Sequence, residues 1–167
     1  TERLQNLQGG SGVTQPLMVD LVDSLPKHPT LPPYQNRTAR IARVVVHHTD
    51  TPPNFTVRQI ADYHVNGERR DTQGNLVKAQ WPGIGYHYVI LPDGTINQTN
   101  RPETRSYHAG NANNDSLGVS LIGAFMRRDW NGTPIPTDQQ LPAPPQLDAL
   151  ARLVAWLLAA GFSPALV

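Results

Sequence analysis

The sequence predicts an α/β domain in which a central mixed β-sheet is flanked by helices. Three observations predict it: apolar, β-branched runs that alternate with helical patterns, an Asp-Gly turn between two such runs, and an amphipathic pattern over residues 147–158. Strands interleaved with helices are typical of α/β architecture. The 167 residues suit one globular domain that buries its own core.

Composition excludes several classes of protein. The chain has 14 Lys and Arg against 13 Asp and Glu, a net charge of +1, and no cysteine. Because it shows no basic cluster, we expect no nucleic-acid partner. The longest apolar run, residues 153–160, is too short to span a bilayer, so we expect no membrane span. The lack of cysteine excludes disulfides, a thiol nucleophile and cysteine-ligated metals.

Residues 1–38 are expected to form an N-terminal linker and a Pro-rich segment that wraps the domain. Residues 8–12 have the composition of a flexible linker, and four prolines between residues 26 and 33 favour extended backbone. The pattern over residues 17–25 allows a short helix. We see no signal peptide, since the chain starts without Met and leads into no apolar segment. The domain itself is expected to occupy residues 39–167.

Two regular elements are predicted at the start of this domain. Residues 41–47 are β-branched and almost continuously apolar, which is typical of a central strand covered on both faces. Thr56 opens a capping box, and apolar residues at helical spacing then predict a helix over 56–66. His64 lies on the apolar face of that helix and is interpreted as a core histidine. Residues 66–80 are polar and predict a surface excursion.

A hairpin, a strand and a helix are predicted in the second half. Residues 86–91 and 95–98 flank the Asp-Gly turn and predict a β-hairpin. Residues 117–123 predict another strand, and residues 129–146 a Pro-rich loop. Gly161 stands where the last helix should be capped. The predicted buried face of that helix carries Leu147, Leu150, Ala151, Val154, Leu157 and Leu158.

The six histidines are the first candidates for chemistry, because imidazole is a common metal ligand and proton carrier near neutral pH. His47 and His48 end the predicted strand. Successive strand residues point to opposite faces, so one metal ion would take only one of them. The pattern alone supports a structural role for the pair equally well, and the chain has no HExxH spacing.

Two further segments carry polar candidates. Tyr86 and His87 open the predicted hairpin behind two glycines, where a ligand can approach the backbone; the alternative is that they are ordinary strand residues. His108 stands in a loop with Asn111 and Asn114, whose amides offer donors and acceptors to a sugar or a peptide. Asparagine is also a common turn residue, so the loop alone does not decide between these interpretations.

Four segments occur together and in a fixed order. They are Val44-Val45-Val46-His47-His48-Thr49, then Gly83-Ile84-Gly85-Tyr86-His87-Tyr88 with Asp93-Gly94-Thr95, then Tyr107-His108-Ala109-Gly110, and finally Ser116-Leu117-Gly118-Val119-Ser120-Leu121-Ile122-Gly123. With them, residues 40–160 resemble the zinc-dependent N-acetylmuramoyl-L-alanine amidases (type 2) and the related peptidoglycan-recognition proteins. The resemblance implies a central sheet with one zinc ion at its rim and a groove for the muropeptide.

The resemblance also implies an activity and residue roles. The enzymes cleave the amide between N-acetylmuramic acid and L-alanine of peptidoglycan, which implies an exported or cell-wall-associated bacterial protein. His47 corresponds to the first zinc ligand, and Tyr86 to the catalytic tyrosine that faces the zinc-bound water or the oxyanion. His108 corresponds to a substrate contact. We take the neighbouring polar residues His48, His87, Asn111 and Asn114 as further substrate-binding candidates.

The sequence departs from the family pattern in two places. The family's other two ligands, a His and then a Cys or Asp, follow the last helix, whereas this chain has no His after His108. We therefore expect a domain truncated at its C-terminal end, with those ligands beyond Val167 and no activity as given. Pairing His47 with His108 or Asp50 would make a much weaker site.

The second departure is Ser120, which stands where some family amidases have a glutamate base. A hydroxyl cannot act as a carboxylate base. The alternative function, which the missing C-terminal ligands favour, is a non-catalytic module that binds peptidoglycan.

Overall fold

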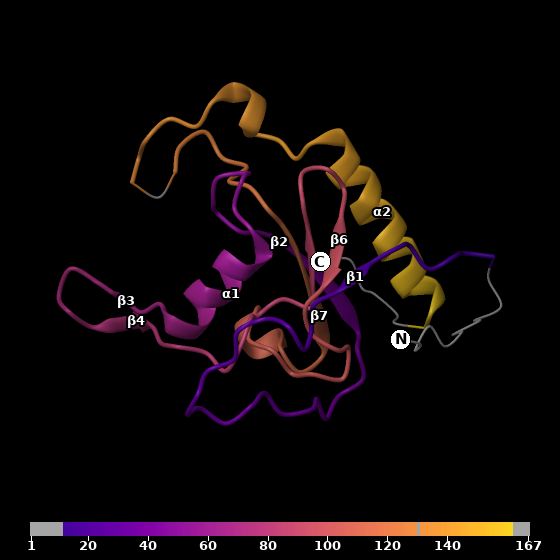
Figure 1. The fold of residues 1–167 in the computed structure, drawn as a ribbon, viewed down its shortest axis with the longest axis horizontal. Helices are drawn as coiled ribbons and strands as arrows, with labels where there is room; N and C mark the ends of the chain where they lie inside the picture. The colour runs from indigo at the N-terminus through magenta and orange to yellow at the C-terminus, as the bar shows by residue number, and fades with distance from the viewer. Residues whose placement is uncertain (1–11, 130, 162–167) are drawn as a thin grey trace.

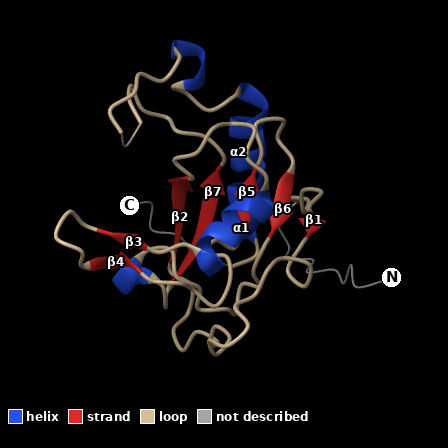
Figure 2. Ribbon diagram, turned by 60° about the vertical axis from the view of Figure 1, so that its left-hand side comes forward, coloured by secondary structure: helices blue, strands red, loops and turns tan. Residues whose placement is uncertain are grey.

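A computed structural model describes residues 12–129 and 131–161. Its elements alternate between strands and helices, and Figure 1 and Figure 2 show one main sheet and a separate small hairpin that extends beyond α1. The elements in chain order are β1 (Val19–Asp20), β2 (Arg43–His48), α1 (Val57–Asn66), β3 (Arg69–Arg70), β4 (Leu76–Lys78), β5 (Tyr88–Ile90), β6 (Ile96–Gln98), η1 (Gly110–Ala112), β7 (Ser116–Leu121), η2 (Thr137–Gln139) and α2 (Pro144–Ala159).

The main sheet has five strands in the order β1-β6-β5-β7-β2. β7 runs parallel to both of its neighbours, β2 and β5, whereas β5 and β6 form an antiparallel hairpin. The sheet is therefore mixed, which confirms the predicted fold class. The Asp-Gly turn of the hairpin is also confirmed, since Gly94 has a φ of 88°, a conformation that favours glycine.

β2 is the last strand of the sheet within the described residues, so its prediction as a central strand is wrong. None of its residues is fully buried: five are half-buried and Val46 is exposed, so the faces of this edge strand are only partly covered. Its continuous apolar character therefore does not show that strands lie on both of its sides.

Two apolar cores lie on opposite faces of the sheet (Figure 2). On one face, Val89 and Ile122 pack against α1 residues such as Ile60. On the other face, strand residues such as Tyr88 pack against α2. His47 belongs to the α1 face, because its register partner Ser120 also pairs with Val89.

The predicted capping of α1 is confirmed. The Thr56 side chain accepts a hydrogen bond from the Gln59 backbone, and the Gln59 side chain accepts one from the backbone of Thr56. His64 is buried on this helix, as predicted. Residues 66–80 form the exposed excursion and contain the β3–β4 hairpin.

The predicted buried face of α2 is largely wrong. The helix buries Gln146, Ala149, Leu153, Trp156 and Leu157, whereas Leu147 and Leu158 are exposed. The side-chain amide of Gln146 donates to the carbonyls of Ile90 (2.9 Å) and Ile122 (3.1 Å), which holds a polar residue against the sheet. Gly161 follows the helix with a φ of 85°. This left-handed conformation favours glycine and agrees with its predicted place at the end of the helix.

The N-terminal segment begins with β1, which pairs parallel to β6, so a helix over residues 17–25 does not form. His28 then fixes the Pro-rich stretch, since its ring bonds Gln80 (2.9 Å) and the backbone N–H of Leu31 (3.0 Å). The linker residues 8–11 lie outside the described residues. Within the described part of the chain, no helix is long and apolar enough to cross a membrane.

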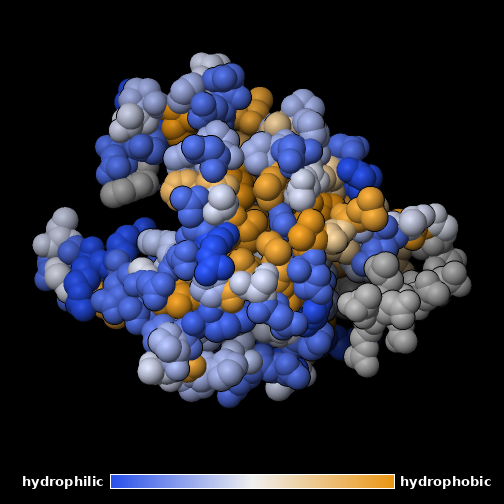
Figure 3. Space-filling view, viewed as in Figure 1, coloured by the Kyte–Doolittle hydropathy of each residue, from blue (hydrophilic) through white to orange (hydrophobic). Residues whose placement is uncertain are grey.

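The face shown in Figure 3 carries apolar side chains at its centre, over the sheet and beside α2. The exposed residues Leu147 and Leu158 add to the apolar surface of this helix. Polar side chains cover the α1 side of the same view.

Candidate functional site

Two histidines 61 residues apart in the chain face each other beside the sheet. His47 lies at the C-terminal end of β2, His108 lies in the loop before η1, and His47 Nε2 is 3.1 Å from His108 Nδ1. The ring of Tyr86 lies with its centroid 5.6 Å from that of His47. Ser120 points to the same face of the sheet as its register partner His47. We call these four residues the candidate site.

A chain of hydrogen bonds fixes where the protons of both imidazoles lie. The Ser116 hydroxyl donates to the Ala112 carbonyl (2.6 Å), so Ser116 Oγ can only accept from His108 Nε2 (3.2 Å). The other ring nitrogen of neutral His108, Nδ1, then carries a lone pair and accepts from His47 Nε2. Neutral His47 consequently keeps its own lone pair at Nδ1.

Burial keeps these histidines neutral at pH 7. It lowers the pKa of His108 to about 4, with a smaller contribution from His47. The pKa of His47 is also lowered, first by burial and then by the charge of His48. A neutral imidazole is the form that binds a metal ion or accepts a proton.

Tyr86 presents a protonated hydroxyl to the candidate site. Burial raises its pKa, and the neighbouring Ser120 hydroxyl opposes this rise only in part. Behind Tyr86 lies His64, whose Nδ1 accepts a hydrogen bond from the Gly85 backbone (3.1 Å). Burial lowers the pKa of His64 to about 3, so this residue is a neutral support for the tyrosine.

His87 lies beneath the candidate site rather than in it. Its side chain is 0% exposed, its Nδ1 accepts from the Gly118 backbone (3.0 Å), and its Nε2 donates to the Thr104 carbonyl (2.9 Å). Substrate contact does not fit this placement, and we assign His87 a structural role. Gly118 in turn leaves room for His108, because a Cβ there would be 2.6 Å from the His108 ring.

The structure separates the remaining substrate-binding candidates. His48 points to the opposite face from His47, and its Nδ1 faces the Gly123 carbonyl at 3.3 Å. Both ends of the Asn114 amide bond Thr38, so this residue also serves the loop structure. Asn111 is exposed on η1, and its side chain makes no hydrogen bond to another described residue. Of these three, only Asn111 is free to meet a ligand.

Arg37 holds the loop that carries His108, a role that sequence analysis did not predict. Its guanidinium donates to the backbone carbonyls of Pro102 (2.6 Å), Thr104 (3.0 Å), Asn114 (3.0 Å) and Ser116 (3.1 Å). These acceptors lie on both sides of His108, so one side chain gathers the loop. An arginine in a Pro-rich segment shows no local pattern that would predict such contacts.

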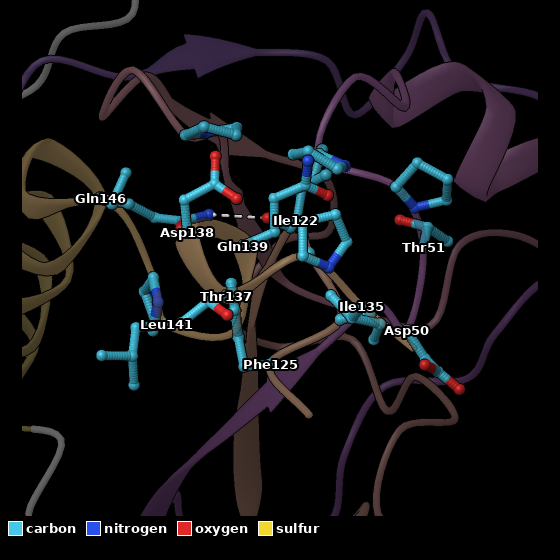
Figure 4. A pocket seen from close by; sticks show the side chains of 18 of the residues that line it. Asp50, Thr51, Ile122, Phe125, Ile135, Thr137, Asp138, Gln139, Leu141 and Gln146 are labelled. Atoms are coloured by element: carbon cyan, nitrogen blue, oxygen red, sulfur yellow. Dashed lines mark hydrogen bonds between the residues drawn. The ribbon is translucent and has the colours of Figure 1, made fainter. Parts of the chain in front are cut away.

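A cavity of about 670 Å³ opens beside the candidate site, between the β2–α1 loop and the Pro-rich loop before α2 (Figure 4). None of the histidines lines it. Asp50 stands at its edge with a φ of 54° and with its carboxylate turned away from the other labelled side chains. Among the described residues, no group of three or more His, Cys, Asp or Glu side chains could hold a metal ion, so Asp50 does not join His47 and His108 as a ligand set.

Comparison with known proteins identifies the class of the chain. A family described as N-acetylmuramoyl-L-alanine amidase matches residues 37–165. The endolysin of Escherichia phage T7 is 31% identical over 121 residues, covering 70% of this chain and 66% of that protein. The chain thus spans just under two thirds of this curated relative.

Solved structures share the fold. The Ph2119 endolysin from Thermus scotoductus MAT2119 bacteriophage Ph2119 has a TM-score of 0.64 at 24% identity, covering 90% of this chain and 84% of its own. A second similar structure is that of peptidoglycan recognition protein-LE in complex with tracheal cytotoxin, a monomeric diaminopimelic acid-type peptidoglycan. It has a TM-score of 0.63 at 22% identity, and the match covers 87% of this chain and 76% of that chain.

Proposed function

Because the chain belongs to the N-acetylmuramoyl-L-alanine amidase family, we propose that it hydrolyses the amide between N-acetylmuramic acid and L-alanine in peptidoglycan. The observation that carries this proposal is the meeting of His47, Tyr86 and His108 on one face of the sheet. Residues 39–167 are then the amidase domain, and residues 1–38 the linker and wrapping segment. We also propose that the protein is exported or associated with the bacterial cell wall, because this substrate lies there.

The family implies a zinc ion, and His47 offers it one ligand. Its neutral ring has a lone pair at Nδ1, while its other nitrogen donates to His108. Histidine ligands of metals commonly donate their second N–H in this way. The described residues contain no group of three or more His, Cys, Asp or Glu side chains that could hold a metal, so they do not complete a zinc site. We propose that the remaining ligands lie outside them.

The roles of the chain's own residues follow from their protonation. Zinc, when bound, polarises a carbonyl and lowers the pKa of its water. The protonated hydroxyl of Tyr86 donates a hydrogen bond to the substrate carbonyl oxygen as negative charge develops there. Loss of one such donor costs about 2.7–4 kcal/mol in known enzymes. His108 orients His47, and Asn111 is free to bind the substrate.

Variants at two residues test this proposal. Incubation of purified peptidoglycan with the natural full-length protein should release L-alanine amino termini, which end-group labelling detects. Tyr86→Phe should lower turnover about 10²–10³-fold and leave the zinc content unchanged. His47→Ala should abolish both zinc binding, measured by elemental analysis, and cleavage. Full cleavage by His47→Ala would contradict the zinc mechanism.

The second candidate is a module that binds peptidoglycan without cleaving it. The incomplete ligand set within the described residues favours this function. It predicts that the full-length protein binds muropeptides but releases no new amino termini at any zinc concentration. Zinc bound at one ion per chain together with new amino termini would contradict it.

A further inference from the structure

Ser120 is the one member of the candidate site to which the proposed function gives no role. It lies on β7, pairs with His47 of β2, and faces the α1 side of the sheet, since its neighbour Val119 belongs to the core on the opposite side. The side chain of Ser120 is completely buried, at 0% exposed. A hydroxyl in this position needs a hydrogen-bond partner within the protein or the substrate.

The Ser120 hydroxyl has no hydrogen-bond partner among the described residues. A buried hydroxyl without a partner costs stability, so its presence in a native structure calls for an explanation. Ser106 shows the contrast, because it is equally buried and its hydroxyl donates to the Gly85 carbonyl at 2.6 Å. Ser120 thus carries an unused donor and unused lone pairs beside His47.

The hydroxyl of Tyr86 is a neighbour that can use this donor. The Tyr86 ring packs against the core on the α1 side, which contains Val89, and Val89 is in register with Ser120. The same ring lies 5.6 Å from that of His47, the partner of Ser120 across the strands. Burial raises the pKa of Tyr86, and the Ser120 hydroxyl is close enough to oppose that rise.

The other polar groups of the candidate site are already engaged. His47 Nε2 donates to His108 Nδ1, and His108 Nε2 donates to the Ser116 hydroxyl. The remaining lone pair of His47 is the one assigned above to the metal ion. This leaves the Tyr86 oxygen as the acceptor for Ser120.

We propose that the Ser120 hydroxyl positions the Tyr86 hydroxyl for its hydrogen bond to the substrate carbonyl oxygen. Ser120 donates to one lone pair of the Tyr86 oxygen, and the Tyr86 proton then points away from Ser120 toward the substrate. Donation to a hydroxyl also polarises its O–H bond and strengthens the bond that it donates. Catalytic hydrogen bonds are often long in the unliganded protein and tighten in the complex. The proposal rests on the function proposed above and names Ser120 as a positioning residue for Tyr86.

The kinetics of Ser120→Ala in the natural full-length protein test this role. Release of amino termini from peptidoglycan should show kcat lowered about threefold to tenfold, with KM and zinc content unchanged, because the bond matters mainly as charge develops on the substrate oxygen. Ser120→Thr keeps a hydroxyl and should retain most of the activity. In a Tyr86→Phe background, Ser120→Ala should cause no further loss, since the group that it positions is gone.

Thermal unfolding separates this role from a structural one. Ser120→Ala removes a hydroxyl that has no partner in the unliganded protein, so its Tm should equal or exceed that of the wild type. Ser106→Ala is the matched control, because it removes an equally buried hydroxyl together with its bond to Gly85 and should lower the Tm. A fall in Tm for Ser120→Ala as large as that for Ser106→Ala would assign Ser120 a structural role and overturn the proposal.

The kinetic outcomes also separate the positioning role from the function on which it rests. A kcat of Ser120→Ala within about twofold of the wild type would overturn the positioning role alone. An equal loss on adding Ser120→Ala to Tyr86→Phe would do the same, since the two residues would then act independently. Failure of the wild type to release any amino termini would overturn the proposed function and the positioning role together.

Discussion

Replacement of Arg37 by leucine should destabilise the domain strongly for a residue outside its apolar cores. The guanidinium donates to four backbone carbonyls at 3.1 Å or less, and to that of Asn113 at 3.5 Å. A buried acceptor that loses its partner costs about 1–3 kcal/mol. Because Arg37 is only half-buried, water can reach some of these carbonyls, and the expected total is about 2–4 kcal/mol.

Thermal unfolding followed by circular dichroism measures this loss. For a domain of this size, about 2–4 kcal/mol corresponds to a fall in Tm of about 5–15 °C. The Tm of Arg37→Lys should lie between those of the wild type and Arg37→Leu, since an ammonium has three donors. Arg40→Leu is the matched control, because Arg40 is exposed and makes no side-chain hydrogen bond to a described residue. If Arg37→Leu melts within about 2 °C of the wild type, the carbonyl bonds do not stabilise the loop and the reasoning is refuted.

Three further changes have expected outcomes. Gly118→Ala should cost about 1–3 kcal/mol and displace the His108 ring, seen as altered imidazole NMR signals, whereas Gly12→Ala, which meets open space, should be neutral. Stability should fall as the pH drops from about 6.5, because the folded state holds His64 and His108 at depressed pKa values and the unfolded chain binds more protons. A Tm that stays constant from neutral pH to about pH 4 would contradict this linkage. Thr56→Ala should cost about 1 kcal/mol and speed hydrogen exchange in the first turn of α1, and unchanged exchange would speak against the cap.

Local rules predicted the elements whose signals are local. The capping box at Thr56 and the Asp-Gly turn depend on residues three or fewer positions apart, and both are present. Which face of α2 is buried depends instead on the sheet residues against which the helix packs. Gln146 is buried because two strand carbonyls accept from its amide, which no count of apolar residues along the helix can reveal.

The candidate site was predictable in part. His47 and Tyr86 were identified through the family resemblance, and the structure brings their rings together. The burial of His87 was not predictable, since a residue between a glycine-containing segment and the start of a strand can face either way. The contact between Gly118 and His108 joins a strand to a loop ten residues earlier, and only the folded backbone reveals it.

The bonds of Arg37 also bear on the order in which the chain folds. The carbonyls it gathers lie 65 to 79 residues further along the chain, beyond α1 and the β5–β6 hairpin. Closing so long a loop costs entropy that only later contacts repay. The local helix and hairpin can form early. The loop that carries His108 becomes ordered only after the N-terminal segment with Arg37 has docked. Refolding should therefore regain helical structure before it regains the ability to bind a ligand.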